Sequence, residues 1–303
     1  MNKAENNKKI ISIDGKLKVE TAEEKKKNTI ITLNESAKSG KILTGQISGV
    51  ERLGKKGPAI AVIYMNDYKI MIPASECIDI PPAGDKDAQQ YELYLLSKRL
   101  GSEVDFVVKC IEEDNEIAVA SRMEAMLKKR KEFLLETDKN GQYIVSEGSV
   151  VEARIVCTTR AGIIVEIFGA ECYIPCRELS YQRIQDATLD FFVGDRILVK
   201  ILSIDRQFDT GIVNIDASVK QANENPYDKA MKFYNEGDKY IGTVSMIDEN
   251  GVFVALNGGI DVLCKYPDRG PRPPRGATVT VRITVKNEEE KRLFGLITHN
   301  ARI

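Results

Sequence analysis

The chain repeats one local pattern three times, and this repetition constrains the fold more than any other feature. Residues 39–42, 147–150 and 236–239 each contain a glycine, and each precedes short runs rich in valine and isoleucine. The three glycines, Gly40, Gly148 and Gly237, are 108 and 89 residues apart. Such spacings are too long for the units of a solenoid and suit small domains in series. We therefore expect three related domains.

Each repeat is typical of a small β-barrel. Five short apolar runs rich in β-branched residues predict five strands, separated by turns containing glycine or asparagine. The first and second repeats place a helical insert between the third and fourth strands, which is the order of an OB-fold barrel. In the third repeat the insert at 267–276 contains too many prolines for a helix. The sequence therefore predicts an all-β chain of three tandem five-stranded OB-fold barrels.

The segments between the repeats predict short helices. Apolar residues recur at helical spacing after residue 121, and Pro226 stands where helices favour proline, near their start. The N-terminal segment is rich in lysine, glutamate and asparagine, as disordered segments are. We expect a disordered charged tail at 1–38, OB-fold domains at 39–120, 147–218 and 236–303, and linker helices at 121–146 and 219–235.

Composition excludes several classes of protein. The formal net charge is −1, from 44 Lys and Arg against 45 Asp and Glu, so nucleic acid can be held only by local basic patches. Six cysteines form no Cys-x-x-Cys pair and His299 is the only histidine, which argues against a metal site. No phosphate loop, nucleophile elbow or membrane-spanning run occurs. We expect a cytoplasmic protein with reduced thiols, no cofactor, no enzymatic activity and no membrane partner.

An ordered set of short motifs resembles the S-one family of ribosomal small-subunit proteins. Residues 178–183, 192–195 and 199–206 resemble the second half of a family domain, and residues 219–244 resemble the junction between two domains. Residues 251–256 resemble the second strand of the family, whereas residues 71–76 and 120–122 fit more weakly. The resemblance covers about 40–303. It implies repeated OB domains that bind single-stranded RNA.

The resemblance also implies RNA-facing positions. In the family these are two aromatic residues around the glycine of the second strand, a histidine ending the third strand and basic residues on the last strand. The third repeat keeps one of the two aromatic residues, Phe253. Asn250 stands at the other aromatic position, and Cys264 stands at the position of the histidine. Lys265 and Arg292 lie near the expected basic positions. Phe253 can equally be a core residue.

The second and first repeats depart further from the family. In the second repeat Ala161, Ile164 and Pro175 occupy the two aromatic positions and the histidine position, and Arg160 and Tyr173 lie nearby. In the first repeat the aromatic positions fall on residues 57–58 and 60–61, none of which is aromatic. Several other basic and aromatic residues are candidates for RNA contacts or for a merely solvated surface: Tyr181, Arg183, Lys55 and Lys56, and three arginines on the proline-rich insert, Arg269, Arg272 and Arg275.

Two functions fit these observations. The first is binding of single-stranded RNA in translation or mRNA handling, with the ribosome as a further partner and the second and third repeats as the better RNA candidates. The second is a protein-docking module on the ribosome or another assembly, including a structural component of a larger particle. The near-neutral charge and the missing aromatic residues favour docking. The sequence does not indicate the oligomeric state.

Overall fold

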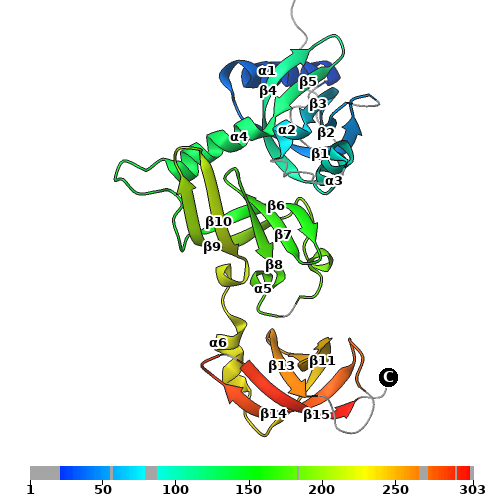
Figure 1. Cartoon of the computed structure of the whole chain (residues 1–303), viewed down its shortest axis with the longest axis vertical. Helices are drawn as coiled ribbons and strands as arrows, with labels where there is room; N and C mark the ends of the chain where they lie inside the picture. Colours follow the sequence, from blue (N-terminus) through cyan, green and yellow to red (C-terminus); the bar gives the residue numbers. More distant parts are fainter. Residues whose placement is uncertain are drawn as a thin grey trace, which may run out of the picture. The chain divides into compact units, whose positions relative to one another are not determined.

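The computed structural model describes residues 21–54, 57–78, 87–182, 184–265, 272–290 and 292–300. Within them, three five-stranded β structures follow one another along the chain, and we call them barrels one, two and three (Figure 1). Barrels one and three are closed, whereas barrel two is a five-stranded sheet whose end strands approach each other without sharing a ladder. The prediction of an all-β chain of three OB-type barrels is confirmed. The chain divides into two compact units, Met1–Leu127 with barrel one and Lys128–Ile303 with barrels two and three.

Barrel one has the strand order β1-β2-β3-β5-β4, in which β3 and β5 pair in parallel. Short helices α2 and α3 lie between β3 and β4 in the sequence, as the sequence predicts for a helical insert. The core contains aliphatic side chains of alternate strand positions together with Phe106 and Tyr68. The elements are β1 (Leu43–Arg52), β2 (Ala59–Met65), β3 (Tyr68–Pro73), α2 (Ala74–Cys77), α3 (Ala88–Ser97), β4 (Glu103–Glu112) and β5 (Ile117–Ser121).

A helix, α1 (Ala22–Ser39), covers part of barrel one, which corrects the prediction of a disordered tail over its residues. Thr21 and Glu24 form a reciprocal capping box that starts the helix. Leu33 is fully buried in the barrel core, and the Ser36 hydroxyl accepts a hydrogen bond of 3.0 Å from the Val108 amide of β4. Only three of the described side chains of this charged helix are buried, those of Thr29, Leu33 and Ser36, which explains why its composition suggested disorder.

Barrel two repeats the arrangement in the order β10-β9-β6-β7-β8. Its core contains Ile155, Val165 and Ile174 from three adjacent strands. Arg206 fixes the loop before β6, since its guanidinium donates to the carbonyls of Leu134 and Val145. The elements are β6 (Val150–Thr159), β7 (Gly162–Ile167), β8 (Ala170–Pro175), α5 (Cys176–Leu179), η2 (Ala187–Leu189), β9 (Arg196–Gln207) and β10 (Ile212–Ser218).

The connecting segments are short helices of mixed type. Between barrels one and two, α4 (Arg122–Lys129) continues into a π-helix, η1 (Arg130–Leu135). Phe133 of η1 stacks on Phe168 of barrel two with ring centroids 4.6 Å apart. Between barrels two and three lie η3 (Lys220–Ala222), α6 (Pro226–Ala230) and η4 (Met231–Phe233).

Barrel three closes in the order β11-β12-β13-β15-β14, with β13 and β15 parallel. The described part of its insert, residues 272–276, contains no helix, as the proline content predicts. Val252, Val254 and Val262 are among the fully buried core residues. The strands are β11 (Lys239–Asp248), β12 (Gly251–Leu256), β13 (Ile260–Lys265), β14 (Thr278–Asn287) and β15 (Arg292–Asn300).

The cysteines are free thiols, and four of the six are buried. Burial raises the pKa of Cys172 to about 11 and that of Cys264 to about 12, so both thiols are protonated near neutral pH. Among the described residues, no group of three or more His, Cys, Asp or Glu side chains could hold a metal ion. No helix in the described part of the chain is long and apolar enough to cross a membrane.

Candidate nucleic-acid interface

The outward face of barrel three carries a row of three apolar side chains on adjacent strands. Phe253 of β12 is paired with Leu263 of β13, and Leu263 is paired with Phe294 of β15. All three are half-buried, while their neighbours Val252, Val254, Val262 and Leu293 fill the core. Since side chains of a strand alternate between its faces, the two phenyl rings belong to the outer surface. We call these three residues the aromatic row.

Basic side chains lie at the ends of the same face. Lys265 stands two residues beyond Leu263 on β13, and Arg292 stands two residues before Phe294 on β15. Lys265 is exposed, and the side chain of Arg292 is 69% exposed, with a contact of 3.4 Å to the carboxylate of Glu290. The structure therefore brings Phe253, Lys265 and Arg292 onto one surface, with the two basic residues at its opposite ends.

The assignment of Cys264 to the histidine position requires a correction. Cys264 is fully buried in the core of barrel three, so it does not face the outer surface. The outward residue at this end of β13 is Lys265 instead. Neighbouring residues of a strand point to opposite faces, so an error of one residue in the alignment places a side chain on the wrong face. The sequence alone did not determine which residues of β13 face outward.

Gly251 allows the strands to approach closely beside the aromatic row. It has a φ of 146°, and a Cβ there would lie 2.3 Å from the carbonyl oxygen of Cys264. The same Cβ would lie 3.3 Å from Leu263 Cδ1, so the leucine side chain covers the glycine. The exposed Asn250 precedes it in a turn that the Asp248 carboxylate fixes by accepting from the Asn250 amide at 2.8 Å.

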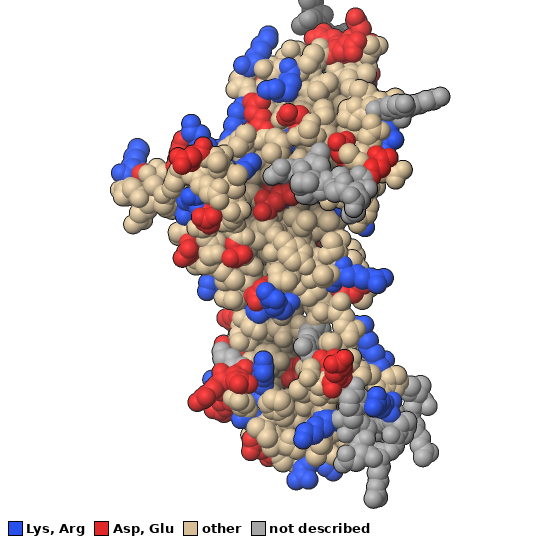
Figure 2. All heavy atoms as spheres, in the orientation of Figure 1, with Lys and Arg blue, Asp and Glu red and all other residues tan. Residues whose placement is uncertain are grey.

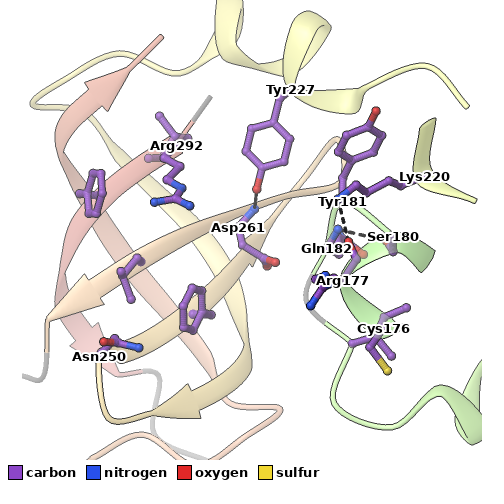
Figure 3. A pocket seen from close by; sticks show the side chains of 15 residues that line it. Cys176, Arg177, Ser180, Tyr181, Gln182, Lys220, Tyr227, Asn250, Asp261 and Arg292 are labelled. Atoms are coloured by element: carbon purple, nitrogen blue, oxygen red, sulfur yellow. Dashed lines mark hydrogen bonds between the residues drawn. The ribbon is translucent and has the colours of Figure 1, made fainter. Parts of the chain in front are cut away.

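The aromatic row forms one wall of a cleft with a volume of about 760 Å³ (Figure 3). The other wall comes from α5 of barrel two, the residues after it and the linker. The cleft brings the predicted residues Tyr181, Phe253 and Arg292 together. Three of its charged lining residues are basic and one, Asp261, is acidic. The other polar residues that line the cleft include Ser180, Gln182, Tyr227 and Asn250, and its basic residues are Arg177, Lys220 and Arg292.

Hydrogen bonds hold the second wall in place. The Lys220 ammonium contacts the Glu178 carboxylate at 3.0 Å and donates to the Arg177 carbonyl at 2.7 Å. Desolvation raises the pKa of Glu178, but hydrogen bonds from Lys220 and Ser218 outweigh it, so the pKa is lowered. From the linker, the Tyr227 hydroxyl accepts a hydrogen bond of 3.0 Å from the Asp261 amide of β13.

Barrel two presents a weaker version of the same face. Tyr173 is 51% exposed and is paired with Ile164. Its hydroxyl lies over Gly162, where a Cβ would be only 2.9 Å away. The outward residues of β10 are Ile212, Asn214 and Asp216, so this strand adds an apolar side chain and a carboxylate but no further aromatic ring. Tyr173 is therefore placed to stack a base, although the adjacent carboxylate disfavours phosphates.

Arg160 is exposed at the end of β6, and its guanidinium lies 3.6 Å from the carboxylate of Asp186. Hydrogen bonds from Thr188 are the main cause of a lowered pKa for Asp186, to which the charge of Arg160 also contributes. The carboxylate is therefore ionised near neutral pH. Because the side chain of Arg160 is 90% exposed, solvent screens this contact strongly. Arg160 remains accessible to a ligand.

The arginines of the insert fall into two groups. Arg275 donates to the side-chain carbonyl of Gln185 at 3.1 Å, so its guanidinium is engaged with barrel two. Arg272 is exposed. Four predicted residues, Arg269, Arg183, Lys55 and Lys56, lie outside the described residues. On the face shown in Figure 2, basic and acidic side chains are interspersed, in agreement with the near-neutral net charge.

Barrel one lacks an aromatic row. The equivalent positions on β2, β3 and β5 are occupied by Val62, Met71 and Val119, which are paired across the three strands. Val62 is fully buried. This aliphatic row offers no aromatic ring on which a base could stack, in agreement with the divergence seen in the sequence. Tyr64 is exposed at the end of β2, two residues beyond the row.

Sequence reasoning missed several residues of the cleft. Phe294 was not singled out, because its place beside Leu263 depends on the parallel pairing of β13 with β15. Its position two residues after Arg292 was the available signal, since both then face the same side of one strand. The lining residues Arg177, Lys220 and Asp261 come from separate segments, and no local pattern joins them.

Comparison with known proteins adds an independent result. Residues 144–212 match the family described as S1 RNA binding domain. Small ribosomal subunit protein bS1 of Neisseria meningitidis is 25% identical over 252 residues, covering 82% of this chain and 40% of that protein. The bS1 protein of Staphylococcus aureus is 26% identical over 235 residues, covering 75% of this chain and 53% of that protein.

A third relative is 4-hydroxy-3-methylbut-2-enyl diphosphate reductase of Clostridium acetobutylicum, which is 32% identical over 183 residues. The match covers 58% of this chain but only 27% of the reductase. This chain thus spans about half the length of its bS1 relatives and less of the reductase. The predicted resemblance is confirmed: residues 144–212 match the family described as S1 RNA binding domain, and the chain is similar over most of its length to small ribosomal subunit protein bS1.

Proposed function

We propose that this protein binds single-stranded RNA in the cleft between the aromatic row and the α5 segment. The observation that carries the proposal is the placement of Phe253, Leu263 and Phe294 across three adjacent strands, with Arg292 and Lys265 at the edges. A row of this kind stacks unpaired bases irrespective of their sequence, and the cations contact the phosphates. The similarity to the S1 RNA binding domain supports the same conclusion.

The expected affinity is moderate and sensitive to salt. Each stacked base contributes about 1–3 kcal/mol, judged by alanine substitution. The cleft offers three cations, Arg177, Lys220 and Arg292, and Lys265 lies on the same strand face. With about four phosphate contacts to a single strand, the logarithm of the affinity falls with the logarithm of salt with a slope of about −3. Tandem barrels on short linkers raise the effective concentration of each further site.

The proposed place of action is translation in the cytoplasm, on the small ribosomal subunit, because the bS1 relatives are proteins of that subunit. A second function, docking to the ribosome or another assembly, is favoured for barrel one. Its aliphatic row has no aromatic ring, and its α1 helix is an additional surface that barrels two and three do not carry in the described residues.

Fluorescence anisotropy with a labelled, unstructured RNA of mixed sequence and about 12 nucleotides tests the proposal. The wild type, Phe253→Ala and the control Phe192→Ala are titrated at 50 and 200 mM salt. Phe192 is an exposed phenylalanine that lies before β9, outside the cleft. Micromolar binding that weakens with salt and with Phe253→Ala alone supports the RNA site. Absence of binding at 50 mM salt refutes it and leaves the docking function.

A further inference from the structure

We propose that the RNA path continues from the cleft onto barrel two, where Tyr173 stacks a further base of the same strand and Arg160 and Arg275 contact its phosphates. We call these three residues the barrel-two subsite. The inference rests on the proposed RNA-binding function and adds to it a second subsite and a minimum length of RNA. Full affinity then requires a strand that reaches from the aromatic row to the barrel-two subsite.

The side chain of Tyr173 extends along the sheet toward the cleft. Its backbone pairs with Ile164, but its hydroxyl lies over Gly162, where a Cβ would be only 2.9 Å away. Gly162 pairs with Pro175, the last residue of β8, and the next residue, Cys176, lines the cleft. The half-exposed ring therefore covers the stretch of sheet between the middle of β8 and the edge of the cleft.

Arg160 adjoins the same end of β8. Its carbonyl oxygen accepts from the Cys176 thiol at 3.2 Å, and the neighbouring carbonyl of Ala161 accepts from the Cys176 amide at 2.9 Å. Figure 3 shows Cys176 on the barrel-two wall of the cleft. The exposed side chain of Arg160 therefore begins where the cleft ends, and its screened contact with Asp186 leaves it accessible to a phosphate.

Arg275 comes from the insert of barrel three and contacts barrel two beside Arg160. Its guanidinium donates to the side-chain oxygen of Gln185 at 3.1 Å, and Gln185 directly precedes Asp186, the partner of Arg160. A guanidinium has five N–H donors, so this bond engages only part of it. Two arginines from different barrels thus flank one short loop, and guanidinium groups bind phosphate oxygens through paired hydrogen bonds.

The carboxylate of Asp216 lies on the other side of β8 from Arg160. Asp216 belongs to β10, whereas Arg160 precedes β7, and β8 lies between these two strands. The Asp216 carboxylate accepts a hydrogen bond of 2.8 Å from the Ser203 hydroxyl of β9. A strand that crosses from the cleft to Tyr173 on the β7 side therefore has the arginines, and not the carboxylate, beside its phosphates.

The test compares unstructured RNAs of four and twelve nucleotides by fluorescence anisotropy, with wild type, Tyr173→Ala and Phe208→Ala. Single OB folds occupy about 4–16 nucleotides, so the shorter RNA fills the cleft and the longer one reaches both barrels. Phe208 is the matched control, an exposed aromatic residue of barrel two outside the cleft. Tyr173→Ala should weaken binding of the longer RNA about five- to tenfold and leave that of the shorter RNA unchanged. Phe208→Ala should change neither.

The salt dependence tests the contribution of Arg160. With the longer RNA, Arg160→Gln should make the salt slope shallower by about 0.7, the value for one phosphate contact on a single strand. With the shorter RNA the slope should stay the same. Arg282→Gln, at an exposed position of β14 outside the cleft, should change neither slope. An unchanged slope for Arg160→Gln with the longer RNA overturns its place in the subsite.

A stoichiometric titration distinguishes one continuous strand from two separate sites. We expect one RNA of twelve nucleotides per protein. Two bound RNAs show that each barrel holds a strand of its own and overturn the inference. Equal weakening of both RNAs by Tyr173→Ala, or no weakening of either, also overturns it, while binding in the cleft stands. Failure of both RNAs to bind the wild type refutes the proposed function as well.

Discussion

Phe294 provides the sharpest test of the aromatic row, because only the strand register identifies it. Replacing it with alanine removes one of the two phenyl rings of the row but leaves the buried neighbour Leu293 in the core. Loss of one stacked base costs about 1–3 kcal/mol, which corresponds to a rise in Kd of about five- to 150-fold. We expect a value near tenfold, because Phe253 and Leu263 still support part of the base.

Anisotropy titration of Phe294→Ala with the mixed-sequence RNA at 100 mM salt measures this change. Phe208→Ala is the control, since Phe208 is 61% exposed in the turn between β9 and β10 and lies outside the cleft. Urea unfolding of each variant separates a loss of binding from a loss of stability. If Phe294→Ala binds as tightly as the wild type and remains folded, the aromatic row is not the stacking surface.

Three further predictions concern charge, packing and pH. Arg292→Ala should weaken RNA binding and make the salt slope shallower by about 0.7, the value for one phosphate contact on a single strand, measured by titration at several salt concentrations. Leu33→Ala should lower the free energy of unfolding of the first unit by about 2–5 kcal/mol in urea, whereas Ile31→Ala, at an exposed position of the same helix, should change it by less than about 0.5 kcal/mol. Because the pKa of Glu178 is lowered below 4.5, the stabilisation from its pair with Lys220 is present above that pH and is lost as the pH falls below it. The difference in stability between wild type and Glu178→Gln should therefore shrink in urea titrations below pH 4.5.

The sequence predicted the three barrels because strand alternation and turn residues are local properties. The same locality explains what was missed. The capping box of Thr21 and Glu24 was present in the sequence, but the burial of Leu33 that stabilises α1 depends on distant strands. The residues of the cleft come from barrel two, a linker and barrel three, so their meeting follows from tertiary packing. Which residues of β13 face outward depends on which of them fill the core. For this reason the sequence assigned Cys264 to the outer surface, where the structure places Lys265.

The contact between α1 and β4 has a consequence for the order of folding during synthesis. Ser36 lies 72 residues before Val108, whose amide it binds, so the helix reaches its final partner only after β4 has left the ribosome. Until then its single buried leucine has no core to enter, and an isolated helix of 18 residues with little apolar surface is marginal in water. Closing so long a loop before its contacts form slows folding. We therefore expect α1 and barrel one to fold together in one late step, and we do not expect α1 to form before the barrel.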